Sequence, residues 1–347
     1  MYGILRALKT TFFCFSEVLY TCDLERRLTE LSASASPLPY TGNKSCIVNT
    51  LLAVMPEHNV YIEPCMGSAE VFFRKPRAEK EILNDYDGDL VNVFRTIQNN
   101  QKLVFLIGRI YLSVNSELLF RENKELLRAT PNILDDLLET SKIIESMKWS
   151  EIKAAAAFFE NQVYSFSSTG QAYGIARRDI SARLARMVSA YIRLRDAIIL
   201  HRDYKDVIEY AACPGSFILL DPPYRGTEGM YKKANFDSKQ HAVLFRFMKE
   251  LDEQFKSELK FLITYNNDPT IRKMAEKQGF DTHVQLRLDN MRQNKNAGAM
   301  YEELLIANYD LNQQAEKNGR SLREANQQLT LFDHRCEAGE EVDNEIL

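Results

Sequence analysis

The chain has 347 residues, and its 45% hydrophobic and 27% charged residues are ordinary for a soluble globular protein of about two domains. A net charge of −4 at pH 7 excludes a generally basic protein, so nucleic-acid binding would need a local basic surface. The six cysteines include no Cys-x-x-Cys pair. Their dispersal argues against zinc and disulfides and predicts no metal and a cytoplasmic location. No apolar run is long enough to cross a membrane.

The first 36 residues have the composition of an N-terminal extension that ends in a Ser/Ala linker. Arg6 and Lys9 precede a Phe-rich stretch, so a signal peptide is an alternative. An extension or amphipathic helix is preferred, because Glu17 interrupts the stretch and no other secretory feature is present.

A doubly wound α/β domain is predicted to begin at residue 37. Residues 37–102 give a helical pattern, a short apolar strand, a Gly-containing turn, a second strand and another amphipathic helix. Strand-like runs return after residue 197, and the last two are expected to form an antiparallel pair. These later runs are residues 197–200, 217–220, 261–264, 283–288 and 304–307.

The alternation of strands and helices stops between residues 103 and 196, where the pattern is mostly helical. This segment is predicted to be a helical insertion within one catalytic domain formed by residues 37–102 and 197–310. Residues 311–347 are Gln/Asn-rich and then acidic, which predicts a solvated or disordered tail.

The most informative motif is Asp221-Pro222-Pro223-Tyr224, directly after the apolar residues 217–220. The four apolar residues are typical of a buried parallel strand, and the two prolines end it. A carboxylate, a rigid turn and an aromatic ring are therefore expected at the carboxyl end of a strand, where open α/β sheets bind ligands. This arrangement suits a flat base with an exocyclic amine.

Two further positions admit both a structural and a functional interpretation. Asp85 follows the second strand, about twenty residues after the first turn, so it either accepts from a ribose hydroxyl or caps a helix. Lys44 lies in a Tyr-Thr-Gly-Asn-Lys turn, either as a solvated lysine or as a charge directed at a carboxylate.

Taken in order, these motifs resemble the Dam-type DNA adenine N6-methyltransferases over roughly residues 37–310. Thr264-Tyr265-Asn266-Asn267 and residues 301–306 extend the resemblance. It implies a Rossmann-like, S-adenosylmethionine-dependent methyltransferase sheet whose mostly helical insertion recognises the target sequence in double-stranded DNA. The expected cofactor-binding residues are Tyr40, Lys44, Glu63, Gly67, Asp85, Asp203 and Asp221.

The first turn departs from the family pattern Glu-Pro-Phe-Ala-Gly-Gly-Gly. Cys65 and Met66 replace the phenylalanine and alanine, and Ser68 and Ala69 replace two glycines. Asn43 also stands where a second glycine is usual.

The expected catalytic residues are Asp221, Pro222 and Tyr224. Hydrogen bonds from adenine N6 to the Asp221 carboxylate and the Pro222 carbonyl would free the nitrogen lone pair, and Tyr224 would stack on the extruded base. Expected DNA contacts come from the loop after Tyr224 and from a segment whose seven arginines could form a phosphate-facing surface. These arginines are Arg177, Arg178, Arg183, Arg186, Arg193, Arg195 and Arg202. The residues assigned to DNA binding are Arg177, Arg178, Arg183, Arg186, Lys232 and Lys233.

Two alternatives stay open at this point. The same turn suits cytosine N4 or another planar amine, although Asp at position 221 favours adenine. The altered first turn also allows an inactive DNA-binding relative. The sequence does not distinguish a restriction-modification enzyme from a phage or orphan enzyme, and it sets no oligomeric state.

Overall fold

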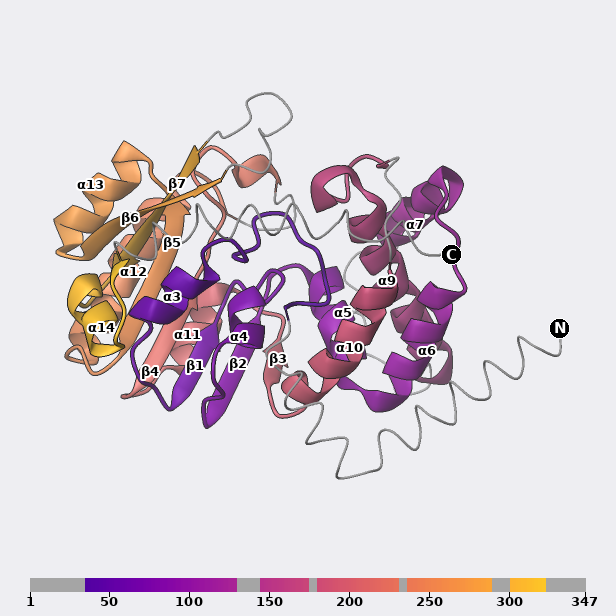
Figure 1. Cartoon of the computed structure of the whole chain (residues 1–347), viewed down its shortest axis with the longest axis horizontal. Coiled ribbons are helices and arrows are strands. Elements are labelled where there is room, and N and C mark those ends of the chain that lie inside the picture. The colour runs from indigo at the N-terminus through magenta and orange to yellow at the C-terminus, as the bar shows by residue number, and fades with distance from the viewer. Residues whose placement is uncertain (1–34, 130–143, 175–179, 231–235, 289–299, 323–347) are drawn as a thin grey trace, which may run out of the picture. The chain divides into compact units, whose positions relative to one another are not determined.

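The structure, a computed structural model, describes residues 35–129, 144–174, 180–230, 236–288 and 300–322 (Figure 1). It divides into two compact units, Met1–Pro39 with Asn92–Asp196, and Tyr40–Val91 with Ala197–Leu347. The boundary between Val91 and Asn92 falls within helix α5, Gly88–Gln98.

The second unit contains a seven-stranded sheet of order β3-β2-β1-β4-β5-β7-β6. The first five of these strands are parallel, whereas β7 runs antiparallel to β5 and β6 antiparallel to β7. The predicted α/β sheet and its closing antiparallel pair are therefore confirmed. The strands are β1 (Val60–Glu63), β2 (Lys80–Asn84), β3 (Ile198–Leu200), β4 (Ser216–Leu220), β5 (Lys260–Asn266), β6 (Asp281–Leu288) and β7 (Met300–Ala307).

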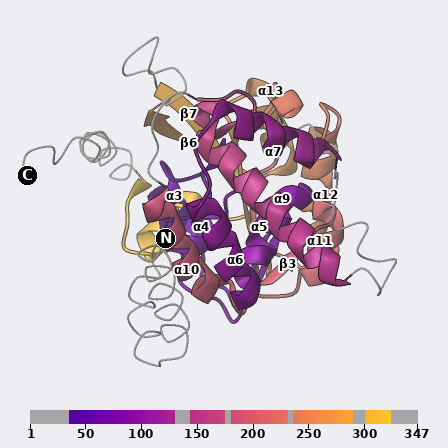
Figure 2. The same cartoon turned by 90° about the vertical axis from the view of Figure 1, so that its right-hand side faces the viewer.

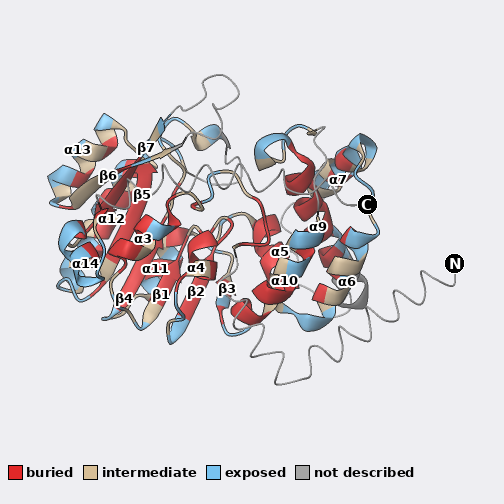
Figure 3. Cartoon of the chain, in the orientation of Figure 1, coloured by how far each residue is buried: buried red, intermediate tan, exposed pale blue. Residues whose placement is uncertain are grey.

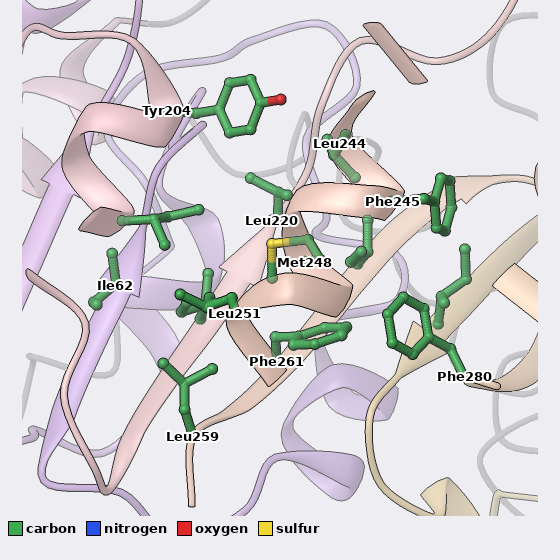
Figure 4. Packing of buried hydrophobic residues seen from close by; sticks show 14 of the residues in the cluster. Ile62, Tyr204, Leu220, Leu244, Phe245, Met248, Leu251, Leu259, Phe261 and Phe280 are labelled. Atoms are coloured by element: carbon green, nitrogen blue, oxygen red, sulfur yellow. The ribbon is translucent and has the colours of Figure 1, made fainter. Parts of the chain in front are cut away.

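Helices cover both faces of this sheet (Figure 1), as its nearly continuous apolar strands require. On one face, strand residues such as Ile62, Leu220 and Phe261 pack against Leu244 and Met248 in a fully buried core (Figure 4). Figure 3 shows the central strands buried along most of their length. The helices of this unit are α3 (Val48–Val54), α4 (Glu70–Arg74), α11 (Tyr204–Ala211), α12 (Gln240–Gln254), α13 (Pro269–Gln278) and α14 (Leu311–Lys317), with a 3₁₀ turn, η2, at Glu228–Met230.

The described part of the first unit is built mainly of helices (Figure 2). The long helix α9 packs against α6 and α7, and it buries the alanine-rich residues 154–157, which favour helix formation. Buried Glu160 of α9 accepts a hydrogen bond from Asn123. The helices are α6 (Asn100–Tyr111), α7 (Glu117–Ala129), α9 (Ile144–Tyr164) and α10 (Ser181–Leu194), with a 3₁₀ turn, η1, at Phe166–Ser168.

The prediction of a disordered tail over residues 311–347 was wrong for the first residues of that segment, which form a helix. Asp310 caps helix α14 by accepting from Gln313, and the helix buries Leu311 and Ala315. Asn318 then donates to the carbonyl groups of Ala53 and Met55 at the end of α3. The polar composition of this segment gave no indication of the helix, because only a few of its residues are buried. Residues 323–347, like the predicted extension up to residue 34, lie outside the described residues.

Candidate active site

The candidate site lies where the strand order of the sheet reverses, between the carboxyl ends of β1 and β4. Glu63 is the last residue of β1, and Asp221 follows directly after β4. Because side chains alternate along a strand, Phe217, Leu219 and Asp221 lie on the same face of the sheet. Tyr61 of β1 pairs with Phe217, so Tyr61 and Glu63 lie on that face as well. A doubly wound sheet binds its ligands at this kind of crevice.

The Asp221 carboxylate is held from two sides. Its Oδ2 atom accepts from the Lys44 ammonium at 2.5 Å, and its Oδ1 atom accepts from the Thr264 hydroxyl at 2.6 Å. Burial raises the pKa of Asp221, and the two donors oppose that rise by stabilising the ionised form. Of the two interpretations of Lys44, the solvated lysine does not fit, because its side chain is 8% exposed and pairs with the Asp221 carboxylate.

Tyr224 is fixed at its hydroxyl end, which donates to Glu303 Oε2 at 2.7 Å. Its ring lies 5.7 Å from that of Tyr265, and the Lys44 ammonium lies 5.1 Å from its centre. Burial raises the pKa of Tyr224 well above its ordinary value, so the hydroxyl keeps its proton and remains a donor. The Asp-Pro-Pro-Tyr turn thus presents a carboxylate and an aromatic ring that share one lysine neighbour.

The first turn and the end of β2 are tied together by Asp85. Its Oδ2 atom accepts from the Gly67 amide and its Oδ1 atom from the Asp87 amide, both at 2.9 Å. Burial raises the pKa of Asp85 to about 6, although these hydrogen bonds oppose the rise. Fully buried Asn84 also bridges the Pro64 and Arg202 carbonyl groups. Asp85 therefore shapes the turn, beyond the cap or ribose contact considered from sequence.

The altered glycine turn keeps the backbone conformation of a glycine turn. Gly67 has φ +47°, and Ala69 has φ +54°, in the left-handed region that glycine favours. Ala69 still closes the turn by donating to the Met66 carbonyl at 2.6 Å. An alanine in this region costs about 1–2 kcal/mol. A residue with a Cβ atom therefore occupies a conformation that glycine favours, at a cost in strain.

The other expected cofactor residues surround the same turn. A Cβ atom at Gly67 would lie 3.5 Å from the Tyr40 ring, so that ring covers the turn. Glu63 is buried and accepts from the Tyr61 hydroxyl, and burial raises its pKa to about 8. Asp203 caps α11 by accepting from the Lys205 amide.

One buried polar group near this turn lacks a hydrogen-bond partner within the described residues. It is the Tyr204 hydroxyl, whose electrostatic neighbours are Asp203 and Cys65. An unpaired buried hydroxyl is costly, which makes a polar ligand at this place favourable.

The structure describes some of the expected DNA-binding residues. Arg183 and Arg186 lie three residues apart on α10 and are half-buried. Arg193, included among the segment's arginines, is 2% exposed, so its expected place on a phosphate-facing surface was wrong. Arg193 lies on the same face of α10 as its buried apolar residues, because of the helical periodicity. Arg177, Arg178, Lys232 and Lys233 lie outside the described residues.

The Ser/Gly/Tyr-rich stretch after α9 forms a short hairpin, where Ser165 bridges Tyr173. The Tyr173 hydroxyl donates to Asn115, and Lys124 donates to the Gln171 carbonyl. Phe166 at its base is 60% exposed. This stretch is therefore anchored to α7 and to the residues before it.

Sequence reasoning assigned no role to Thr264, Asn84 or Glu303. Each is a buried polar residue beside an apolar run, at 0%, 0% and 2% exposure. A polar residue beside an apolar run can indicate a functional position, because a buried polar group needs a hydrogen-bond partner. The sequence does not show which partners these three residues have, because the partners are far away along the chain.

Among the described residues, no group of three His, Cys, Asp or Glu side chains is placed to hold a metal ion. Within the same residues, no helix has both the length and the apolar character needed to span a membrane.

The sheet topology and the Asp-Pro-Pro-Tyr turn at its carboxyl edge define a methyltransferase of amino groups. The family model of the D12 class N6 adenine-specific DNA methyltransferases matches residues 40–293. Since this match covers well over half of the chain, the protein belongs to that family.

Two curated relatives are similar at low identity. A DNA N-6-adenine-methyltransferase of Escherichia phage P1 is 24% identical over 255 residues, which are 70% of this chain and 31% of the relative. The Type II methyltransferase M1.LlaDCHI of Lactococcus lactis subsp. cremoris is 25% identical over 197 residues, 53% of this chain and 64% of the relative. The chain therefore matches less than two thirds of each relative.

Proposed function

We propose that this protein transfers a methyl group from S-adenosylmethionine to the N6 amine of adenine in double-stranded DNA, in a phage or bacterial cytoplasm. The observation that carries the proposal is the Asp221 carboxylate, bonded to Lys44 and Thr264 at the carboxyl end of β4. Family membership and the names of the two relatives support the same reaction.

The cofactor is assigned to the crevice at the first turn. Tyr40 would cover it, Gly67 would allow close approach, and Glu63 and Asp85 would provide polar contacts along its floor. S-adenosylmethionine supplies an electrophilic methyl group when it is bound there. The unpaired Tyr204 hydroxyl and the glycine-like turn support this placement.

The catalytic task of the protein is to make a poor nucleophile reactive. The N6 lone pair of adenine is delocalised into the ring, which weakens it. Asp221 and the Pro222 carbonyl would accept from the N6 hydrogens and favour a pyramidal nitrogen. The carboxylate would also stabilise positive charge that develops on N6.

Asp221 can accept a further hydrogen bond, since a carboxylate has about four acceptor positions and the described partners use two. Lys44 and Thr264 restrict its orientation, so little reorganisation is needed. Tyr224 would stack on the extruded base, which is worth about 1–3 kcal/mol and offsets part of the cost of leaving the duplex.

The recognition of DNA is assigned to the helical unit. Arg183 and Arg186 of α10 would contact phosphates, together with Arg177 and Arg178 of the same segment. Lys232 and Lys233, in the loop after Tyr224, would add contacts from the sheet-containing unit. The hairpin at residues 165–174 carries an exposed aromatic ring and exposed polar groups, which suits contact with nucleotides.

The test is transfer from methyl-labelled S-adenosylmethionine to unmethylated DNA, followed by digestion and mass spectrometry of the nucleosides. N6-methyladenine is expected. N4-methylcytosine would overturn the base assignment, and no product together with no cofactor binding would indicate an inactive relative.

Two variants test the role of Asp221. Asp221→Asn keeps the shape but removes the charge, and it should lower the rate about 100-fold or more. Asp206→Asn, at an exposed position on α11, is the matched control and should retain wild-type activity. Equal rates in Asp221→Asn and the control would refute the mechanism.

A further inference from the structure

A buried glutamate at the antiparallel edge of the sheet has no place in the mechanism above. Glu303 lies on β7 and is 2% exposed, directly before the apolar residues 304–307. A buried carboxylate is unfavourable unless donors surround it. Its partners therefore indicate what it does.

Each oxygen of Glu303 accepts from a different side chain. Oε2 accepts from the Tyr224 hydroxyl at 2.7 Å, and Oε1 accepts from Arg287 Nε at 2.9 Å. The Arg287 guanidinium also lies 4.2 Å from the centre of the Tyr301 ring. Glu303 thus connects the Asp-Pro-Pro-Tyr turn to the β6–β7 pair.

The strand register explains this connection. Gln285 pairs with Glu303 and Arg287 with Tyr301, so the four side chains share one face of the two strands. Arg287 reaches Glu303 diagonally, a distance that a long side chain spans. On its other side, β7 pairs with β5, where Asn266 is opposite Glu303. The carboxylate is therefore held in a fixed position by the sheet.

We propose that Glu303, held by Arg287, is a positioning residue that fixes the Tyr224 ring for stacking on the target base; this inference rests on the proposed function. Pro222 and Pro223 restrict the backbone before Tyr224, and Glu303 anchors the far end of its side chain. Tyr265 limits the ring from the side. A ring fixed in advance loses less freedom when the base arrives.

A purely structural role for Glu303 makes a different prediction. If Glu303 served only to stabilise the β6–β7 pair, its replacement would lower the stability of the protein without depending on the Tyr224 hydroxyl. If Glu303 acts through Tyr224, weakening the hydrogen bond from either side should have the same effect on catalysis. Glu303→Gln replaces the charged acceptor by a weaker neutral one, and Tyr224→Phe removes the donor. A double-mutant cycle separates the two cases.

The experiment uses the full chain and four variants, with methyl transfer to unmethylated DNA as the readout. Glu303→Gln and Tyr224→Phe should each lower kcat about tenfold, and the double variant should be no slower than either single one. The KM for S-adenosylmethionine should stay within about twofold of wild type, since Glu303 contacts the ring rather than the first turn. Glu302→Gln is the matched control, because Glu302 is exposed on the same strand and accepts from Asn267; it should keep wild-type kcat.

Independent effects that multiply in the double variant would overturn the proposal, as would equal rates in Glu303→Gln and Glu302→Gln. If Glu303→Gln does not fold, the double variant Arg287→Met/Glu303→Met replaces the buried pair by apolar side chains of similar length. It should fold and show the same tenfold loss of kcat. Wild-type kcat in this variant would also refute the proposal.

A second measurement does not depend on methyl transfer. With ¹³C-labelled tyrosine, the Tyr224 Cζ resonance is assigned by its absence in Tyr224→Phe. It should shift and broaden in Glu303→Gln but not in Glu302→Gln. An unchanged resonance would refute the positioning role, whereas a wild-type protein that makes no N6-methyladenine would refute the proposed function instead.

Discussion

The buried carboxyl group of Glu63 should make the stability of this protein fall as pH rises. Glu63 is 5% exposed, and burial raises its pKa from 4.5 to about 8, with nearby Asp221 adding to the rise. The folded state therefore keeps a proton that the unfolded state releases above pH 4.5. The stability that this proton contributes is complete below pH 4.5 and is lost as pH rises towards 8.

The size of the effect follows from the two pKa values. Each pKa unit corresponds to about 1.4 kcal/mol, so the full difference is worth about 5 kcal/mol between pH 4.5 and 8. From pH 6 to pH 8 the free energy of unfolding should fall by up to about 3 kcal/mol on account of Glu63. Asp85, with a pKa of about 6, contributes in the same direction mainly at lower pH.

Glu63→Gln tests this reasoning, because glutamine has the shape of the protonated acid and cannot ionise. The variant should match wild type near pH 6 and exceed its free energy of unfolding by about 2–3 kcal/mol at pH 8. Urea unfolding at several pH values measures this difference. Glu57→Gln, at an exposed glutamate before β1, is the control and should follow the wild-type curve. Parallel curves for wild type and Glu63→Gln between pH 6 and 8 would refute the assignment.

Three further perturbations have defined outcomes. Lys75→Met should cost about 3–5 kcal/mol in urea unfolding, because it removes the cation that neutralises the buried Glu81 carboxylate, whereas Lys75→Met/Glu81→Leu should cost less; equal losses would contradict this. Gly67→Ala should lower the free energy of unfolding by about 1–2 kcal/mol, because position 67 has a left-handed backbone conformation that alanine disfavours. Calorimetry should also show weaker binding of S-adenosylmethionine to this variant. Unchanged stability and affinity would show that the turn tolerates a side chain. Arg183→Gln/Arg186→Gln should reduce the slope of log affinity for DNA against log salt by about 2, and an unaltered slope would place the phosphate contacts elsewhere.

Much of the fold could be predicted from local sequence. The apolar residues 217–220 followed by two prolines define a buried strand and its end, and no distant residue is needed to recognise them. The same local pattern predicts that Asp221 and Tyr224 lie at the carboxyl edge of a parallel sheet. The antiparallel pair β6 and β7 was also predicted correctly, from its apolar composition and its position near the end of the domain.

Polar composition was less reliable, because it averages over residues that face different ways. Arg193 was grouped with the other arginines of its segment, yet the helical period turns it into the interior. Helix α14 was hidden within a Gln-rich stretch, although Leu311 is fully buried. In both places the burial of one side chain decides the structure, and composition does not report it.

The sequence by itself determined the kind of sheet, the Asp-Pro-Pro-Tyr turn and the chemistry that this turn suits. The tertiary structure decided which side chains act on that turn. Lys44 and Thr264 reach Asp221 from 177 and 43 residues away, and Glu303 accepts from Tyr224 across 79 residues. Such contacts depend on strand order and register, which bring distant residues to one edge of the sheet. Local periodicity determines which face of a strand or helix a side chain lies on. Its interaction partner is determined only when the strands pair in the sheet.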